Sequence, residues 1–341
     1  MSIRKTLYKG VLQAVRPFIL IHRKVPLEVK ALANRHCIVS GVISLSGKRF
    51  YIGHSDENTF FRTASLTKLV TTFGVMKCGL DLDAPISSYT NLSLKNITLR
   101  QLMSHTSPLC DGDAYEHALL SPVDLNTLLE NPSVWKKEPG FRYSNLGFGI
   151  VGSVLECVTG ESLELWMQKN VFTPLKMNCT YDITTLTHAK DIYRLVPPQR
   201  AFDFNLRKAK ASPILKTDPQ RHFTLASGNL YSDTLSLEKA LDVIRENDGS
   251  FISKEAICQM KTPHAEYGAS SPMLAYGLGL LIVRGKETLY GHQGFAYGCV
   301  NSMFFAEKSG KTLISLNNGA NEARFGRMGE LNRDLIQWGF E

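Results

Sequence analysis

The chain has 341 residues, 43% hydrophobic and 21% charged, which is ordinary for a globular protein with a sizeable core. Its formal net charge is +8, but residues 1–30 alone contribute seven Lys and Arg against one Glu. The rest is nearly neutral, so a nucleic-acid partner is not expected. No run approaches the roughly 20 apolar residues of a transmembrane helix, so no membrane span is expected either.

The basic start allows two interpretations. Arg16 and Pro17 interrupt the apolar run that a secretory signal needs. An acid-poor, Arg-containing amphipathic start is typical of an organelle transit peptide. Apolar residues at every fourth position from Ile3 to Ile19 also fit a helix packed on a sheet, which is the favoured interpretation.

The seven cysteines are scattered, odd in number and without a Cys-x-x-Cys pair. This usage predicts reduced core thiols in a cytoplasmic protein. No His-Glu-x-x-His or similar spacing indicates a metal. Gly277-Leu278-Gly279 lacks the third glycine and the following helix of a dinucleotide loop, so no cofactor is expected.

A hairpin opens the folded part. Residues 36–45 are rich in β-formers, Ser46-Gly47 is a turn signal, and Arg49–Gly53 predicts the returning strand. The pattern from 61 to 265 is mostly helical, with helices expected at Leu99–His105, Val123–Leu129, Asn145–Cys157, Ser162–Val171, Leu235–Asn247 and Lys254–Lys261. Within it, Tyr181–Phe223 shows no clear period and carries several prolines and the basic cluster Arg207, Lys208 and Lys210.

The C-terminal part is β-rich and then helical. Antiparallel strands are expected at Tyr276–Val283, Glu287–Tyr290, Cys299–Ala306 and Thr312–Asn317. A last amphipathic helix should place five residues on one face: Phe325, Met328, Leu331, Leu335 and Trp338. The two ends of the chain thus predict one discontinuous α/β domain, residues 1–60 and 266–341, with a mostly helical domain of residues 61–265 inserted.

The stretch around Ser65 carries the strongest chemical signal. Ser65 and Lys68 form a Ser-x-x-Lys pair at the start of a helix that runs to Cys78 and is closed by Gly79. Positions i and i+3 share a helix face, so both side chains should point the same way. A first-turn serine also gains from the helix dipole, which favours a developing negative charge.

Two further motifs follow in order. Tyr143-Ser144-Asn145 is a Tyr-x-Asn, and His292-Gln293-Gly294 is a His-x-Gly. Together with Ser-x-x-Lys they resemble the three motifs of the serine β-lactamase-like superfamily, in its class C-like branch of β-lactamases, D-alanyl-D-alanine carboxypeptidases, D-aminopeptidases and esterases. The likeness extends over roughly residues 36 to 320.

The resemblance implies a fold and a site. The fold would be an antiparallel five-stranded sheet flanked by N- and C-terminal helices, with the active site in the cleft beside the helical domain and Tyr181–Phe223 as a wall or surface loop. The oxyanion hole would use the backbone N–H groups of Ser65 and Phe295. Gly294 would let the substrate approach the strand, and Asn145 would bind the substrate and brace Lys68.

The general base remains open between two residues. Tyrosine and lysine both titrate above pH 10, so either must fall by about 3 units to act near neutral pH. An ammonium beside a phenolate could supply that shift, which favours Tyr143 as base with Lys68 as its partner. The reverse assignment stays possible, because the two groups share one proton.

His292 carries information about the substrate, because many relatives have lysine there to bind a carboxylate. Histidine is mostly neutral at pH 7, which favours uncharged esters, amides or thioesters. His105 is assigned a structural role, and Pro108 replaces the glycine usual after that segment.

The predicted function is a serine hydrolase with an acyl-enzyme on Ser65, acting as an esterase or amidase on a small acylated compound. Alternatives are an acyltransferase using the same acyl-enzyme, a D-specific peptidase or a β-lactamase, and a non-catalytic binder on the same scaffold. The partner expected is a small ester, amide or peptide substrate.

Overall fold

The computed structural model describes residues 25–341 apart from 93, 95, 122, 139, 187–192, 196–197, 201–213, 270 and 297. The helix expected over residues 3–19 and the basic cluster Arg207, Lys208 and Lys210 lie outside the described residues.

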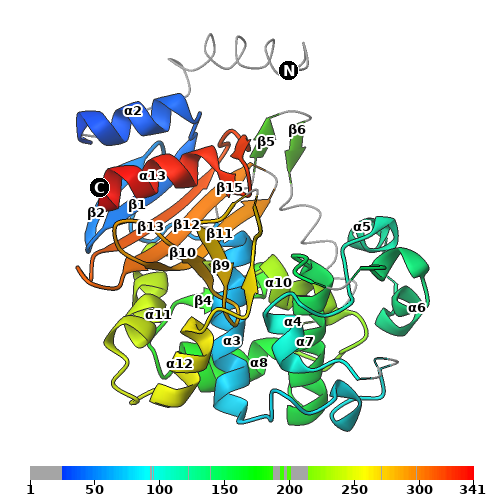
Figure 1. The fold of residues 1–341 in the computed structure, drawn as a ribbon. Coiled ribbons are helices and arrows are strands. Elements are labelled where there is room, and N and C mark those ends of the chain that lie inside the picture. Colours follow the sequence, from blue (N-terminus) through cyan, green and yellow to red (C-terminus); the bar gives the residue numbers. More distant parts are fainter. Residues whose placement is uncertain are drawn as a thin grey trace.

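An antiparallel sheet of eight strands, in the order β2-β1-β13-β12-β11-β10-β9-β8, forms the centre of the molecule (Figure 1). Its strands are β1 (Ser40–Leu45), β2 (Lys48–Ile52), β8 (Ala265–Glu266), β9 (Leu274–Tyr276), β10 (Leu281–Val283), β11 (Leu289–Ala296), β12 (Cys299–Ala306) and β13 (Thr312–Asn318). β1 pairs with β13 from Ser40 opposite Asn318 to Leu45 opposite Leu313. The two ends of the folded chain therefore meet in one sheet, as the sequence predicted.

The expected count of five strands is wrong, and glycine explains part of the difference. The single strand expected over Tyr276–Val283 is two antiparallel strands, β9 and β10, joined by a turn. The Gly277 N–H donates to the Leu280 carbonyl over 2.8 Å, and Gly279 has φ +62°, in the left-handed region that favours glycine. The chain therefore reverses, and β9 and β8 extend the sheet beyond β10.

Helices cover the two faces of the sheet. α2 (Leu27–Arg35) and α13 (Glu330–Phe340) lie on one face, where Val29 and Leu335 share a buried cluster with Leu313 (Figure 1). Ile314, the next residue of β13, belongs to the cluster on the other face, which the helical body fills. This alternation is the period-2 pattern of a strand buried on both sides.

The helical body comes from the middle of the chain. It contains α3 (Thr67–Cys78), α4 (Leu99–Met103), α5 (Asp113–Leu120), α6 (Leu125–Leu129), α7 (Asn145–Thr159), α8 (Leu163–Met167), α10 (Leu225–Gly228), α11 (Thr234–Glu246) and α12 (Lys254–Lys261). Helix α5 was not predicted. The division of the chain into two domains stays a prediction.

Two expectations about side chains need correction. The last helix begins only at Glu330, so Phe325 and Met328 lie before it, in the short hairpin of β14 (Arg324–Phe325) and β15 (Met328–Gly329). None of the seven cysteines, all of them described, forms a disulfide, but they are not all core thiols. Three are buried, two are half-buried, and Cys157 and Cys258 are exposed.

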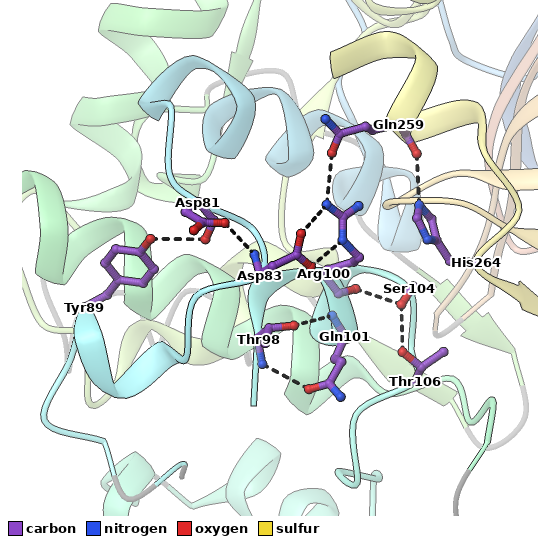
Figure 2. A network of polar contacts seen from close by, with 10 residues as sticks. All are labelled: Asp81, Asp83, Tyr89, Thr98, Arg100, Gln101, Ser104, Thr106, Gln259 and His264. Atoms are coloured by element: carbon purple, nitrogen blue, oxygen red, sulfur yellow. Dashed lines mark hydrogen bonds and ion pairs between the residues drawn. The ribbon is translucent and has the colours of Figure 1, made fainter. Parts of the chain in front are cut away.

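A polar network fixes α4 to its neighbours (Figure 2). Arg100 donates to both carboxylate oxygens of Asp83, over 2.6 and 2.8 Å, and to Gln259 of α12 over 3.2 Å. At the start of α4, Thr98 and Gln101 form a capping box, each side chain accepting from the other's backbone N–H. These contacts hold the segment that leads into the second motif.

Among the described helices, none is both long and apolar enough to cross a membrane alone; α7 with the following segment to Phe172 passes only as a pair bent by 81°.

Candidate active site

Ser65 lies in a 3-10 turn, Ala64–Leu66, that runs directly into α3. Ala64 has φ +51°, a conformation that costs a non-glycine residue free energy and persists only where the surroundings impose it. Here the Thr63 N–H donates to the Leu230 carbonyl over 2.8 Å, and Thr67 Oγ1 donates to the Ala64 carbonyl over 2.6 Å. Ser65 is thus held on a short, braced turn.

Lys68 is fully buried and lies against Ser65, as the i, i+3 spacing predicted. Its Nζ donates to Ser65 Oγ (3.0 Å), Asn145 Oδ1 (2.7 Å) and the Ser227 carbonyl (2.6 Å). Burial lowers the pKa of Lys68 to about 7, against an upward effect of Asp111 and with a smaller downward effect of Arg62. Near neutral pH this amine can therefore lose its proton and accept another.

Tyr143 reaches the same place from the residues before α7. Lys68 Nζ lies over the face of its ring, 4.9 Å from the centroid. The ring is half-buried, but the hydroxyl oxygen is inaccessible and has no hydrogen-bond partner among the described residues.

The pKa of Tyr143 departs from the expectation. Burial raises the pKa of Tyr143 well above its ordinary value, and the nearby Ser65 hydroxyl lowers it only in part, without a hydrogen bond of normal geometry. Sequence reasoning expected the Lys68 ammonium to lower this pKa. The shift has the opposite direction, because desolvation dominates and Lys68 faces the ring.

Asn145 is the first residue of α7, and its amide is clamped. Its Oδ1 accepts from Lys68, and its Nδ2 donates to Asp111 Oδ2 over 2.7 Å. Asp111 was not among the predicted site residues. In the sequence, its position in the loop between the His105 segment and the Tyr-x-Asn motif could have indicated a place near the site.

The third motif lies on β11, beside the Ser65 turn. β10 pairs with β11 only from Leu289 to Gly291, so the strand from His292 onward has no β10 partner. A Cβ on Gly294 would lie 2.7 Å from the Thr63 carbonyl and 3.3 Å from the Ser65 nitrogen. Glycine is required for this close approach. The Phe295 backbone follows directly, and its part in an oxyanion hole stays a prediction.

His292 is buried, and both of its ring nitrogens are used. Nδ1 donates to the Gln293 carbonyl over 2.5 Å, so Nε2 accepts from the Tyr276 hydroxyl over 2.7 Å. Burial, together with the positive charge of Lys68, lowers the pKa of His292 to about 3. The ring is neutral, as expected, but it has no free nitrogen for a substrate. Tyr276, its partner, was missed by the sequence analysis.

His105 lies closer to the site than its structural assignment suggested. Its ring centroid is 4.2 Å from that of Tyr143 and 4.6 Å from that of Tyr276. Its Nδ1 accepts from the Ser144 N–H over 3.1 Å, and burial lowers its pKa well below the ordinary value. It packs as a neutral ring behind Tyr143. No group of three His, Cys, Asp or Glu side chains suited to a metal occurs in the described part of the chain.

Comparison with known proteins identifies the family. A family model described as Beta-lactamase matches residues 39–337, most of the chain. This chain belongs to the β-lactamase family. The motifs Ser-x-x-Lys, Tyr-x-Asn and His-x-Gly therefore occur in a chain that belongs to a family of serine enzymes.

Two curated relatives illustrate the range of that family. Penicillin-binding protein 4* of Bacillus subtilis is 26% identical over 137 residues, which are 36% of this chain and 30% of the relative. ML-236A carboxylate methylbutanoyltransferase mlcH of Penicillium citrinum is 26% identical over 301 residues, 69% of this chain and 68% of the relative. The chain thus spans under a third of the first relative and about two thirds of the second.

Solved structures share the fold at low identity. EstCE1, a hydrolase with promiscuous acyltransferase activity, has a TM-score of 0.71 and 18% identity, with 92% of this chain and 98% of that chain covered. D-amino acid amidase of Ochrobactrum anthropi, complexed with D-phenylalanine, has a TM-score of 0.69 and 21% identity over the same shares.

Proposed function

We propose that this chain is a serine hydrolase that forms a covalent acyl-enzyme on Ser65. The observation that carries the proposal is the 3.0 Å contact between Lys68 Nζ and Ser65 Oγ, with the pKa of Lys68 lowered to about 7 by burial. An activated serine needs a base within hydrogen-bond reach and with a pKa near the working pH. Lys68 meets both conditions.

The proposed reaction has two halves. Neutral Lys68 takes the hydroxyl proton as Ser65 Oγ attacks the acyl carbon, and the oxyanion forms beside the N–H groups of Ser65 and Phe295. The bond to the leaving group then breaks, and the proton taken up by Lys68 returns to that group through the Tyr143 hydroxyl. Water repeats the sequence in reverse and frees Ser65.

This scheme changes the role first expected for Tyr143. A phenol whose pKa is raised by burial holds its proton at neutral pH, which suits a proton donor better than a base. Lys68 is accordingly proposed as the base, and Tyr143 as the acid for the leaving group. Asn145 would hold Lys68 and meet the polar part of the substrate.

The proposed substrate is a small uncharged ester or amide. His292 stands where many relatives have a lysine, but it is neutral and its nitrogens are hydrogen-bonded within the protein. It therefore offers no cation to a carboxylate-terminated peptide or a β-lactam. A panel of neutral esters, their carboxylate-bearing analogues, D-amino-acid amides and a cephalosporin tests this; preferential turnover of the charged members would contradict it.

Acyl transfer is the second candidate, because one curated relative is a methylbutanoyltransferase and one structural neighbour is described with promiscuous acyltransferase activity. The same acyl-enzyme would then be attacked by an alcohol or amine. Product analysis with competing acceptors separates the two, since hydrolysis product alone at every acceptor concentration argues against transfer.

The Ser65→Ala substitution tests the nucleophile. A fluorophosphonate probe should label the native protein, and Ser65→Ala should remove the label and lower turnover by about 10³- to 10⁶-fold. Intact-mass spectrometry measures the adduct. Ser250→Ala, an exposed serine, is the matched control and should label normally. Unchanged turnover in Ser65→Ala would refute the proposed function.

A further inference from the structure

The loop that carries Asp111 closes over the start of α7. Its carboxylate accepts four hydrogen bonds there: from Ser144 Oγ (3.1 Å), the Asn145 N–H (2.9 Å), Asn145 Nδ2 (2.7 Å) and the Leu146 N–H (3.0 Å). The two backbone donors are groups that any helix N-terminus leaves unpaired. The bond from Asn145 Nδ2 is different, because it involves a side chain of the second motif.

That bond decides which end of the amide faces Lys68. An amide side chain has one donor end and one acceptor end. Because Asp111 Oδ2 accepts from Nδ2, the Oδ1 end is turned to Lys68, whose Nζ donates to it over 2.7 Å. Asp111, Asn145 and Lys68 thus form one chain of hydrogen bonds that ends at Ser65 Oγ.

Asp111 is also the carboxylate whose charge acts on Lys68. Arg62 of β3 (Phe61–Arg62) acts in the opposite sense, and burial outweighs both, leaving the pKa of Lys68 at about 7. The other titratable groups packed there, namely Tyr143, His105 and His292, are kept uncharged by burial. The charge of Asp111 also acts on Glu116 of α5, whose pKa is raised by burial, by Asp111 and by Asp113.

We propose that Asp111 is a positioning residue of the reaction: it holds Lys68 against Ser65 through Asn145, and its negative charge helps Lys68 to hold its proton. This inference rests on the proposed function. It adds a residue outside the three motifs to the groups on which the rate depends.

Asp111→Asn separates the effect of the Asp111 charge from the effect of its hydrogen bonds at the start of α7. The variant keeps an acceptor oxygen but removes the negative charge that helps Lys68 hold its proton. Lys68 should then be neutral at lower pH, and the acid limb of the acylation rate should move to lower pH by about 1 unit. The rate of fluorophosphonate labelling between pH 5 and 9 measures the limb, and its plateau should also fall.

Two variants serve as controls. Ser144→Ala removes the hydrogen bond that Ser144 Oγ donates to Asp111 and the one that it accepts from the Gly147 N–H, but leaves the charge of Asp111 in place. Its limb should stay at the native pH even if the protein is less stable. Asp111→Glu retains the charge with a longer side chain. The acid limb of its pH–rate profile should lie near the native pH, whatever the maximum labelling rate.

If folded Asp111→Asn keeps the acid limb of its pH–rate profile at the native pH, the proposal is overturned. An equal shift of that limb in Ser144→Ala would also overturn it. If Asp111→Asn does not fold, Asp111→Ser makes the same test, and failure of both to fold while Ser144→Ala folds would make Asp111 a structural cap only. Failure of the proposed function is a separate outcome, because native protein would then not be labelled at all.

Discussion

Lys68 illustrates how far a single side chain departs from its ordinary chemistry. A lysine in water holds its proton to above pH 10, whereas this one is fully buried and its pKa is lowered to about 7. Burial destabilises the ammonium form of Lys68 more than the Asp111 carboxylate stabilises it. The residue is thereby suited to accept a proton from Ser65 near neutral pH.

The pH dependence of acylation tests this assignment. The base form of Lys68 is the neutral amine, so the rate should fall about tenfold per pH unit below a limb near pH 7 and level off above it. Stopped-flow labelling with a neutral ester or fluorophosphonate measures the profile. His292, with a pKa lowered to about 3, should add no limb in this range. A rate that still rises beyond pH 9 would identify Tyr143 as the base instead.

The helices show where local sequence signals are sufficient. α3 is closed by Gly79, with φ +69°, as predicted, whereas α7 runs two residues beyond the predicted Cys157 and is closed by Gly160, with φ +68°. α12 has the predicted bounds, and it begins after Ser253, whose side chain accepts from the Ala256 N–H. Caps are contacts between residues three or four positions apart, so they can be seen in the sequence.

The capping box of α4 gives a measurable case. Thr98→Ala removes the side chain that accepts from the Gln101 N–H over 3.2 Å (Figure 2). We expect a loss of about 1 kcal/mol in the free energy of unfolding. Urea unfolding of Thr98→Ala, Gln101→Ala and the double variant measures the coupling between the two. If the losses simply add, the reciprocal contact contributes nothing.

The turn between β9 and β10 joins the sheet to the helical body. The Leu278 N–H donates to the Met260 carbonyl of α12 over 3.1 Å, and the Gly279 N–H donates to the Met103 carbonyl of α4 over 2.9 Å. A Cβ on Gly279 would lie 2.0 Å from Thr72 Oγ1 and 3.0 Å from the Lys68 carbonyl. This turn therefore packs directly behind the helix that carries Lys68.

Gly279→Ala should disturb both packing and activity. The left-handed φ and the clash with Thr72 together should cost about 2 kcal/mol or more. Gly268→Ala is the matched control, since Gly268 has φ +78° but open space around its Cβ position, and it should cost only about 1 kcal/mol. Thermal unfolding and the labelling rate measure the pair. Equal losses in the two variants would contradict the packing argument.

The sequence by itself determined the three motifs, most helix positions and the meeting of the two chain ends in one sheet. Ser-x-x-Lys shares a helix face by local geometry, and strand and helix periods are local as well. Only the tertiary structure decided that Asp111 clamps Asn145, that Tyr276 occupies a nitrogen of His292, and that the pKa values of Lys68 and Tyr143 move apart. The reason is that burial and charge at these side chains come from segments far away in the chain, so no single stretch of sequence records them.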